Sequence, residues 1–295
     1  MLDVMMDALI DSVKLLPFLF LTYLVMEYIE DHAGGKTEQA IQKSGKFGPV
    51  IGGILGVIPQ CGFSTAAASL YAGRVVTLGT LIAIFLSTSD EMLPILIGEL
   101  AKGTATVSTP GTAITVSLVV RILCLKVVIG IIAGVLIDLF VKKKKAQQEH
   151  LHIHDLCEHD HCHCERGILY SALRHTMQIF VFILLITLGL NLLIHEVGED
   201  TIANIILNRP VLGELLAGLV GLIPNCAASV ALTQLYVEGA MSGGALMSGL
   251  FVSAGVGVLV LCRTNHHPAE NIRIIALLYT IGVLAGMLVG ALGLL

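Results

Sequence analysis

The chain has 295 residues and a net charge of -5; 55% of its residues are hydrophobic and only 13% are charged. Its mean hydropathy is +0.87. Soluble domains carry about 25% charged residues, so this composition excludes a soluble globular domain. We expect an integral membrane protein in contact with membrane lipid and without a nucleic-acid partner.

Four apolar stretches follow one another in the first half of the chain. The first covers residues 8–28, and the second, 47–72, is interrupted by a Pro-Gln-Cys sequence. A third covers 77–99, and a fourth, 116–141, ends in four lysines, Lys142 to Lys145. Because about 20 apolar residues cross a bilayer, the first, third and fourth stretches are predicted to be spanning helices.

The interruption of the second stretch carries the motif Gly-x-Ile-Pro-x-Cys-x-x-Ser at residues 56–64. Each arm beside it has about a dozen residues, or ~18 Å of helix, against ~30 Å of hydrocarbon. We therefore expect a re-entrant helical hairpin with Cys61 near its tip, and two full spans are the alternative. A broken backbone inside a membrane is tolerated only where protein or a cavity surrounds it.

The motif recurs at residues 221–229, and both copies lead to a Leu-Tyr pair. Further matches follow in the same order in the two halves: Phe85 and Ser87 with Phe251 and Ser253, and Arg121, Gly130 and Gly134 with Arg273, Gly282 and Gly286. This ordered series indicates a duplication. It predicts a first membrane repeat at 1–141, a His/Cys-rich linker at 142–167 and a second membrane repeat at 168–295.

Charge sets the predicted orientation, because Lys and Arg concentrate in cytoplasmic loops. With Lys142 to Lys145 inside, Arg74, Arg263 and Arg273 also fall on or near the inside. The expected fold is an all-α polytopic membrane protein with two inverted repeats. Each repeat has three spanning helices plus a Pro-broken helical hairpin, or five helices per half and ten in all. We place it in the cytoplasmic (inner) membrane, with the linker in the cytoplasm.

The two motifs supply the predicted transport site. Its residues are Pro59, Gln60, Cys61, Ser64, Pro224, Asn225, Cys226 and Ser229. The prolines suit the first turn of a helix, which aims helix N-termini at the membrane centre. A cysteine there favours its thiolate, and two thiolates suit Cu(I), Zn(II) or As(III). Helix N-termini bind anions, so a small anion or organic acid is an alternative cargo. In a structural alternative, the two cysteines bind no ligand and only fill space.

Asp90 and Glu91 are adjacent acids within the third stretch. A charge near the bilayer centre costs on the order of 2.5–3.5 kcal/mol, so we interpret them as a proton relay or cation ligand beside a second helix break. A structural ion pair with Arg121 or Lys126 is the alternative. Otherwise Arg121 and Lys126 are interpreted as flank residues whose charged ends snorkel to the membrane surface.

The linker is rich in metal-binding side chains, with six His and three Cys within residues 150–165. They are His150, His152, His154, Cys157, His159, His161, Cys162, His163 and Cys164. Imidazole and thiolate suit zinc and copper, and the irregular spacing predicts a flexible capture segment instead of a fixed zinc site. A cytoplasmic capture segment favours export over import; a solvated linker with incidental metal affinity is the alternative.

The paired motifs, the central His/Cys tract and the chain length resemble the ten-helix heavy-metal exporters, relatives of the ArsP-type permeases. The resemblance covers nearly the whole chain, and the doubled Pro-Cys motif is its most specific part. It implies efflux of copper, zinc or a trivalent arsenical across the cytoplasmic membrane.

We therefore predict a secondary exporter of a soft metal or metalloid. Two alternatives stay open: a transporter of a small anion or organic acid, and a non-transporting metal or redox sensor. The sequence contains no P-loop motif for ATP and no catalytic constellation, so an enzyme is not expected. We expect no permanently bound cofactor, only a captured or transported zinc or copper ion, and we leave the oligomeric state open, a homo-oligomer included.

Overall fold

The computed structural model describes residues 47–57, 61–89, 115–144, 211–237 and 241–295, with single positions between 13 and 24, 92 and 96, and 169 and 188, and Gly239. Several predicted features lie outside these residues. They are Pro59 and Gln60 of the first motif, the acidic pair Asp90 and Glu91, and the metal-binding tract at 150–165.

All regular secondary structure within the described ranges is helical, as expected. The first half contains α3 (Gly48–Leu55), α4 (Cys61–Ala72), α5 (Leu78–Ser87) and α7 (Val116–Lys144). The second half contains α11 (Leu212–Gly221), α12 (Cys226–Val237), α13 (Gly243–Val252), α14 (Gly257–Thr264) and α15 (Pro268–Ala291).

The same three-helix packing occurs in both halves. Helix α5 packs against α3 and α7, and α13 packs in the same way against α11 and α15. Glycines permit the closest approach: a Cβ on Gly134 would lie 2.4 Å from the carbonyl oxygen of Gly79, and one on Gly286 would lie 2.5 Å from the backbone nitrogen of Ser248. Gly134 and Gly286 are residues that the sequence comparison matched to each other.

The central helices α5 and α13 begin and end alike. Thr77 caps α5 by accepting a hydrogen bond from the Thr80 backbone N–H, and Ser242 caps α13 through that of Ala245, both being preferred N-cap residues. Helix α5 ends at Ser87 and α13 ends at Val252. The helix break expected beside Asp90 and Glu91 is therefore present, and a similar break separates α13 from α14.

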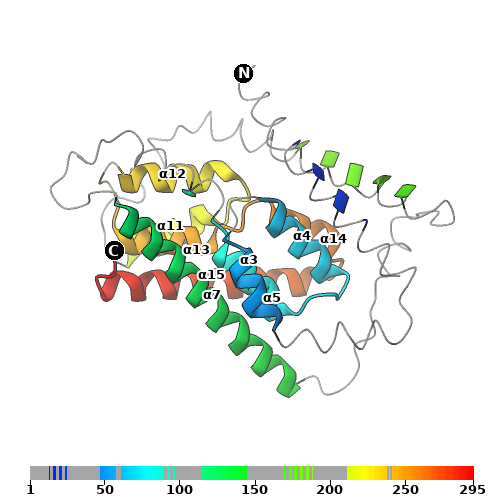
Figure 1. Ribbon diagram of the computed structural model, residues 1–295, viewed down its shortest axis with the longest axis horizontal. Helices are drawn as coiled ribbons and strands as arrows, with labels where there is room; N and C mark the ends of the chain where they lie inside the picture. The colour runs from blue at the N-terminus through cyan, green and yellow to red at the C-terminus, as the bar shows by residue number, and fades with distance from the viewer. Residues whose placement is uncertain are drawn as a thin grey trace.

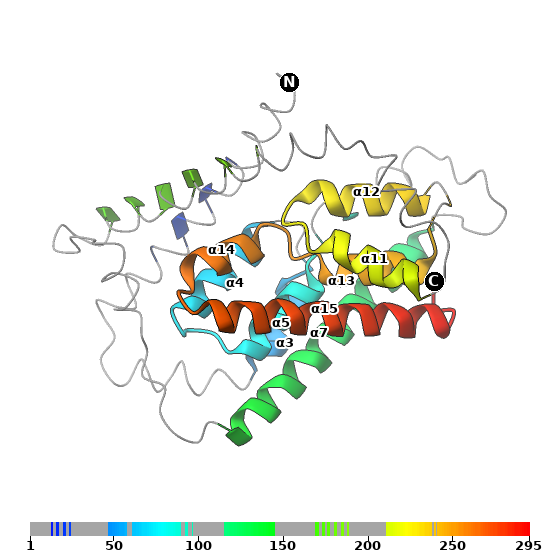
Figure 2. The same cartoon turned by 180° about the vertical axis from the view of Figure 1, so that it is seen from behind.

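Helix α15 runs along the length of the described core (Figures 1 and 2). Its first turn bonds to Arg74, three residues before the α5 cap, while Gly290 in its last turn lies against Gly244 at the start of α13. Helices α5 and α13 therefore begin near opposite ends of α15. The two halves also meet directly, because α4 packs against α14.

Three described stretches are long and apolar enough to cross a membrane: Val116–Val141, Gly243–Thr264 and Pro268–Ala291. The second is 89% buried, against 28% and 33% for the other two, so α13 and α14 are interior while α7 and α15 lie outside. The exposed face of α7 is apolar, with Val128, Ile132 and Leu136 in one row, as expected for a helix facing lipid. The chain is a multi-pass membrane protein.

Candidate functional site

Each copy of the motif lies in a gap between two short helices. Helix α3 ends at Leu55 and α4 begins at Cys61, while α11 ends at Gly221 and α12 begins at Cys226. The two cysteines are thus the first residues of corresponding helices, where backbone N–H groups lack helical partners.

Helix α12 begins two residues later than we expected. Pro224 lies in the bend before the helix and not in its first turn, and Asn225 immediately precedes the helix. The physical reason is a backbone turn: the N–H of Asn225 donates to the carbonyl oxygen of Ile223 at 2.7 Å, which keeps Pro224 outside the helix. The N-terminal end is therefore fixed at Cys226.

The other described motif residues are buried. Ser64 and Ser229 lie one turn into α4 and α12, and neither they nor Asn225 exceeds 3% exposure. All three already interact with other groups of the protein.

The helix ends of the two halves meet around the start of α4. The Ser89 hydroxyl, just beyond α5, donates to the carbonyl oxygen of Val57, just beyond α3, at 2.6 Å. From the second half, the first residue of α14 packs on α4: a Cβ on Gly257 would lie 2.7 Å from the Cβ of Ser64. The first turn of α4 therefore lies within a cluster of helix ends contributed by both halves.

Ser253 is a polar residue that the sequence reasoning did not select. It follows α13, is 3% exposed, and its hydroxyl has no hydrogen-bond partner within the described structure. A buried polar group without a partner costs about 1–3 kcal/mol, so such a hydroxyl is typical of a position that holds a ligand or water. Its match with Ser87 was the one sequence signal for it.

The interpretation of Lys126 as a snorkelling residue is wrong. Its side chain is fully buried, donates to the carbonyl oxygen of Leu250 in α13, and places Nζ 5.6 Å from the ring centroid of Phe251. Carbonyls in the last turn of a helix lack helical partners and attract a cation. The reason for the error is that α13 ends inside the protein within reach of Lys126, which the pattern of α7 alone cannot reveal.

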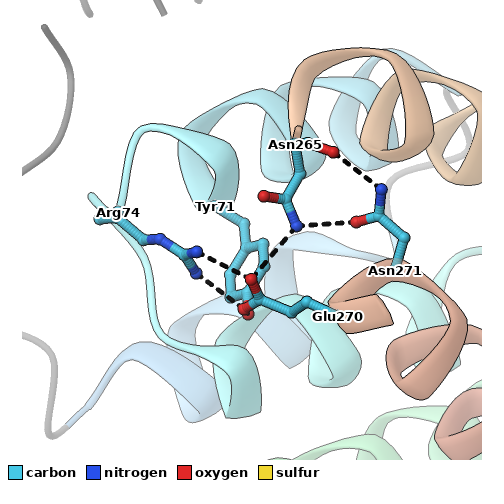
Figure 3. Close-up of polar contacts among 5 residues, drawn as sticks. All are labelled: Tyr71, Arg74, Asn265, Glu270 and Asn271. Carbon is cyan, nitrogen blue, oxygen red and sulfur yellow. Dashed lines mark hydrogen bonds and ion pairs between the residues drawn. The ribbon is translucent and has the colours of Figure 1, made fainter. Parts of the chain in front are cut away.

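A further polar cluster joins the end of α4 to the start of α15 (Figure 3). Arg74 donates two hydrogen bonds of 2.8 Å to the carboxylate of Glu270, and the Tyr71 hydroxyl donates to the same carboxylate. These hydrogen bonds raise the pKa of the Arg74 guanidinium above its ordinary value, so it stays charged. We call Tyr71, Arg74 and Glu270 the Arg74 cluster.

Two asparagines extend the Arg74 cluster across the turn between α14 and α15. The Asn265 side chain donates to the side-chain oxygen of Asn271 at 2.7 Å, and the Asn271 side chain donates to the Asn265 carbonyl oxygen at 2.8 Å. Asn265 also donates to Glu270 at 3.5 Å. The turn and the ion pair therefore form one connected network, as Figure 3 shows.

Among the described residues, no three His, Cys, Asp or Glu side chains form a group that could hold a metal ion. The free cysteines Cys124 and Cys262 are both exposed. What the described arrangement offers chemically is a set of helix ends inside the protein, with partial positive charge at the starts of α4, α12 and α14.

These features define a class of protein: a helical, multi-pass membrane protein whose helices are broken within the core. Residues 1–203 match a family described as "Putative, 10TM heavy-metal exporter". The match covers more than half of the chain, and the chain belongs to this family, which confirms the resemblance seen in its motifs. Neither the curated proteins nor the solved structures gave a match.

Proposed function

We propose that this protein is a secondary exporter of a soft heavy metal or metalloid, with copper, zinc and trivalent arsenic as the candidates. One observation carries the proposal: two corresponding short helices of a heavy-metal exporter family member each begin at a cysteine, Cys61 in α4 and Cys226 in α12. Thiolates at two such helix starts would form one soft binding site.

The proposed architecture is a pair of inverted repeats. Support comes from the ends of α15, because α5 begins near its first turn and α13 near its last. In transporters built from inverted repeats, the substrate site lies near the midplane between the repeats and is formed by discontinuous helices. The breaks before Cys61 and Cys226 have this character.

Two further groups of residues would supply the metal and couple its transport to an ion gradient. His150, Cys157 and the other ligands of the tract would capture metal in the cytoplasm and pass it to the paired cysteines. Asp90 and Glu91 would serve as a proton relay or cation ligand beside the break after α5. The protein would lie in the cytoplasmic membrane, with the tract on the cytoplasmic side.

Lys126 supports a second candidate function, the transport of a small anion or organic acid. The Lys126 side chain is fully buried at the end of α13, and the helix starts of α4 and α14 carry partial positive charge, a combination that can bind an anion. The same groups suit a metal carried as an anionic complex, and they do not repel a neutral arsenite. A Lys126→Met variant compared with Lys126→Arg separates these cargoes, because only an anionic cargo requires the positive charge.

Transport by reconstituted vesicles tests the proposal. The variants Cys61→Ser and Cys226→Ser are compared with the exposed control Cys124→Ser, using Cu(I), Zn(II), Cd(II), arsenite and citrate as separate probes. We expect each motif variant to lose transport of the thiophilic probes, and the control to keep it. Equal transport by all variants would remove the thiol site, and citrate transport alone would favour the second candidate.

A further inference from the structure

Each half of the protein places a buried carboxylate at the start of its central helix. In the first half this is Asp138 of α7, at the start of α5; in the second half it is Glu214 of α11, at the start of α13. The two carboxylates do not come from matching helices: α15, which matches α7, has Gly290 at the position of Asp138. In the second half the carboxylate at the start of the central helix therefore comes from α11.

Asp138 is fully engaged as a helix cap. Its carboxylate accepts from the Gly79 backbone N–H at 2.9 Å and from the Thr77 hydroxyl at 2.7 Å. Both oxygens therefore have a donor, and the negative charge lies at the positive end of α5. This is a structural role that needs no ligand.

Glu214 occupies the corresponding place without such partners. Its side chain is only 8% exposed, and Oε2 has no hydrogen-bond partner within the described structure. Small residues pack closely around the carboxylate: a Cβ on Gly244 would lie 2.9 Å from Oε1, 3.0 Å from the Cα of Gly290 and 3.2 Å from the carbonyl oxygen of Gly286. A carboxylate oxygen without a partner can take up a proton, and a protonated carboxyl group can donate a hydrogen bond.

We propose that Glu214 binds and releases the proton that couples transport to a proton gradient, an inference that rests on the proposed export function. The proton adds to a carboxylate oxygen from water at the end of the molecule where α13 begins and α15 ends, and leaves again as the protein changes conformation. A proton fits this closely packed position better than a metal ion, because a metal requires four or more ligands. The described neighbourhood supplies one carboxylate and the carbonyl oxygen of Gly286.

Among the described residues, few other titratable groups lie on the helices that pack against this position. Helix α13 carries none, and α15 contributes Tyr279, whose hydroxyl donates to the Leu215 carbonyl oxygen at 3.1 Å. Glu270 and Arg273 lie at the opposite end of α15, about 25–30 Å away along the helix. Helix α12 carries Tyr236 and Cys226.

The test uses the full-length protein in two measurements. Infrared difference spectra between acidic and alkaline buffer report the C=O band of protonated carboxyl groups. We expect Glu214→Gln to lose one component of this band, Glu214→Asp to retain it at a shifted position, and Asp138→Asn to leave it unchanged. Identical spectra for wild type and Glu214→Gln would overturn the proposal.

Vesicles with a trapped pH dye then test coupling, with Zn(II) and arsenite as probes. We expect wild type to move protons with the probe, and Glu214→Gln to lose this proton movement while folding normally. Proton-coupled transport that persists in Glu214→Gln, or a dependence on sodium in place of pH, would overturn the proposal. A wild type that moves no probe would contradict the export function, and the infrared measurement would still decide whether Glu214 binds a proton.

Discussion

The ends of α4 and α12 occupy matching places in the two halves, and they carry different side chains. After α4 the chain has Arg74 at φ 58°, and after α12 it has Gly239 at φ 76°. Tyr71 donates to Glu270, whereas the buried hydroxyl of its counterpart Tyr236 has no hydrogen-bond partner in the described part of the chain. The backbone conformation is therefore repeated in the two halves. Among the described residues, the hydrogen bonds that join the end of α4 to α15 have no counterpart at the end of α12.

This difference concerns how the end of α4 is stabilised. A positive φ costs an L-residue about 1–2 kcal/mol, which glycine avoids. Arg74 has this strained conformation, and the two hydrogen bonds that it donates to Glu270 offset the cost. Within the described part of the chain, the Arg74 cluster therefore stabilises the contact between the end of α4 and the start of α15.

The largest expected effects concern the scaffold that both halves share. Gly134→Val and Gly286→Val each force a side chain against backbone atoms of the neighbouring helix, so we expect a loss of about 3 kcal/mol or more in the free energy of unfolding. Denaturant titration in detergent measures it. An effect confined to one of the two variants would contradict the shared packing. Leu288→Ala, at an exposed position of α15, is the control.

The next largest loss of stability is expected at the end of α4, where the Arg74 cluster lies. Removing the ion pair by Arg74→Ala or Glu270→Gln should lower the free energy of unfolding by about 1.5–3 kcal/mol. The double variant should lose less than the sum of the two single losses, because both remove the same interaction. Strict additivity would mean that the two side chains do not stabilise the protein together.

Replacing the two tyrosines by phenylalanine compares the ends directly. Tyr71→Phe removes a hydrogen bond to a carboxylate and should cost about 1–1.5 kcal/mol. Tyr236→Phe removes a buried hydroxyl without a described partner, so we expect no loss or a small gain in stability. Equal losses at both positions would show that Tyr236 has a partner in the folded protein.

The smallest effect should come from the backbone itself. Gly239→Ala places a Cβ on a residue with positive φ and should cost about 1 kcal/mol. Arg74→Gly relieves the same strain while losing the ion pair, so its net loss should be smaller than that of Arg74→Ala. The difference between the free energies of unfolding of Arg74→Gly and Arg74→Ala therefore measures the strain at this position.

The sequence predicted the features that depend on local pattern. Apolar length indicated a membrane protein, the repeated motif predicted paired helix breaks, and the family membership followed from the same residues. The break after α5 could be predicted because Ser87, Asp90 and Glu91 interrupt an apolar stretch. These features depend on residues that are close together in the sequence, so they can be predicted without knowing which helices pack against them.

Contacts between distant helices could not be predicted in this way. Lys126 looked like a flank residue because its partner, the end of α13, lies 124 residues away. Arg74 and Glu270 are separated by 196 residues, and nothing in either local sequence indicates the other. The exchange of the buried carboxylate between Asp138 and Glu214 becomes visible only when the two three-helix units are compared in space.

The most direct test of the central claim is X-ray absorption spectroscopy of bound arsenite. The protein would carry serine in place of Cys124, Cys157, Cys162, Cys164 and Cys262, so that only the two motif cysteines remain. We predict arsenic bound by two sulfur atoms in this protein, and loss of that coordination after either Cys61→Ser or Cys226→Ser. Arsenic without sulfur ligands, or sulfur coordination that survives both single changes, would contradict a binding centre shared by the two helix starts.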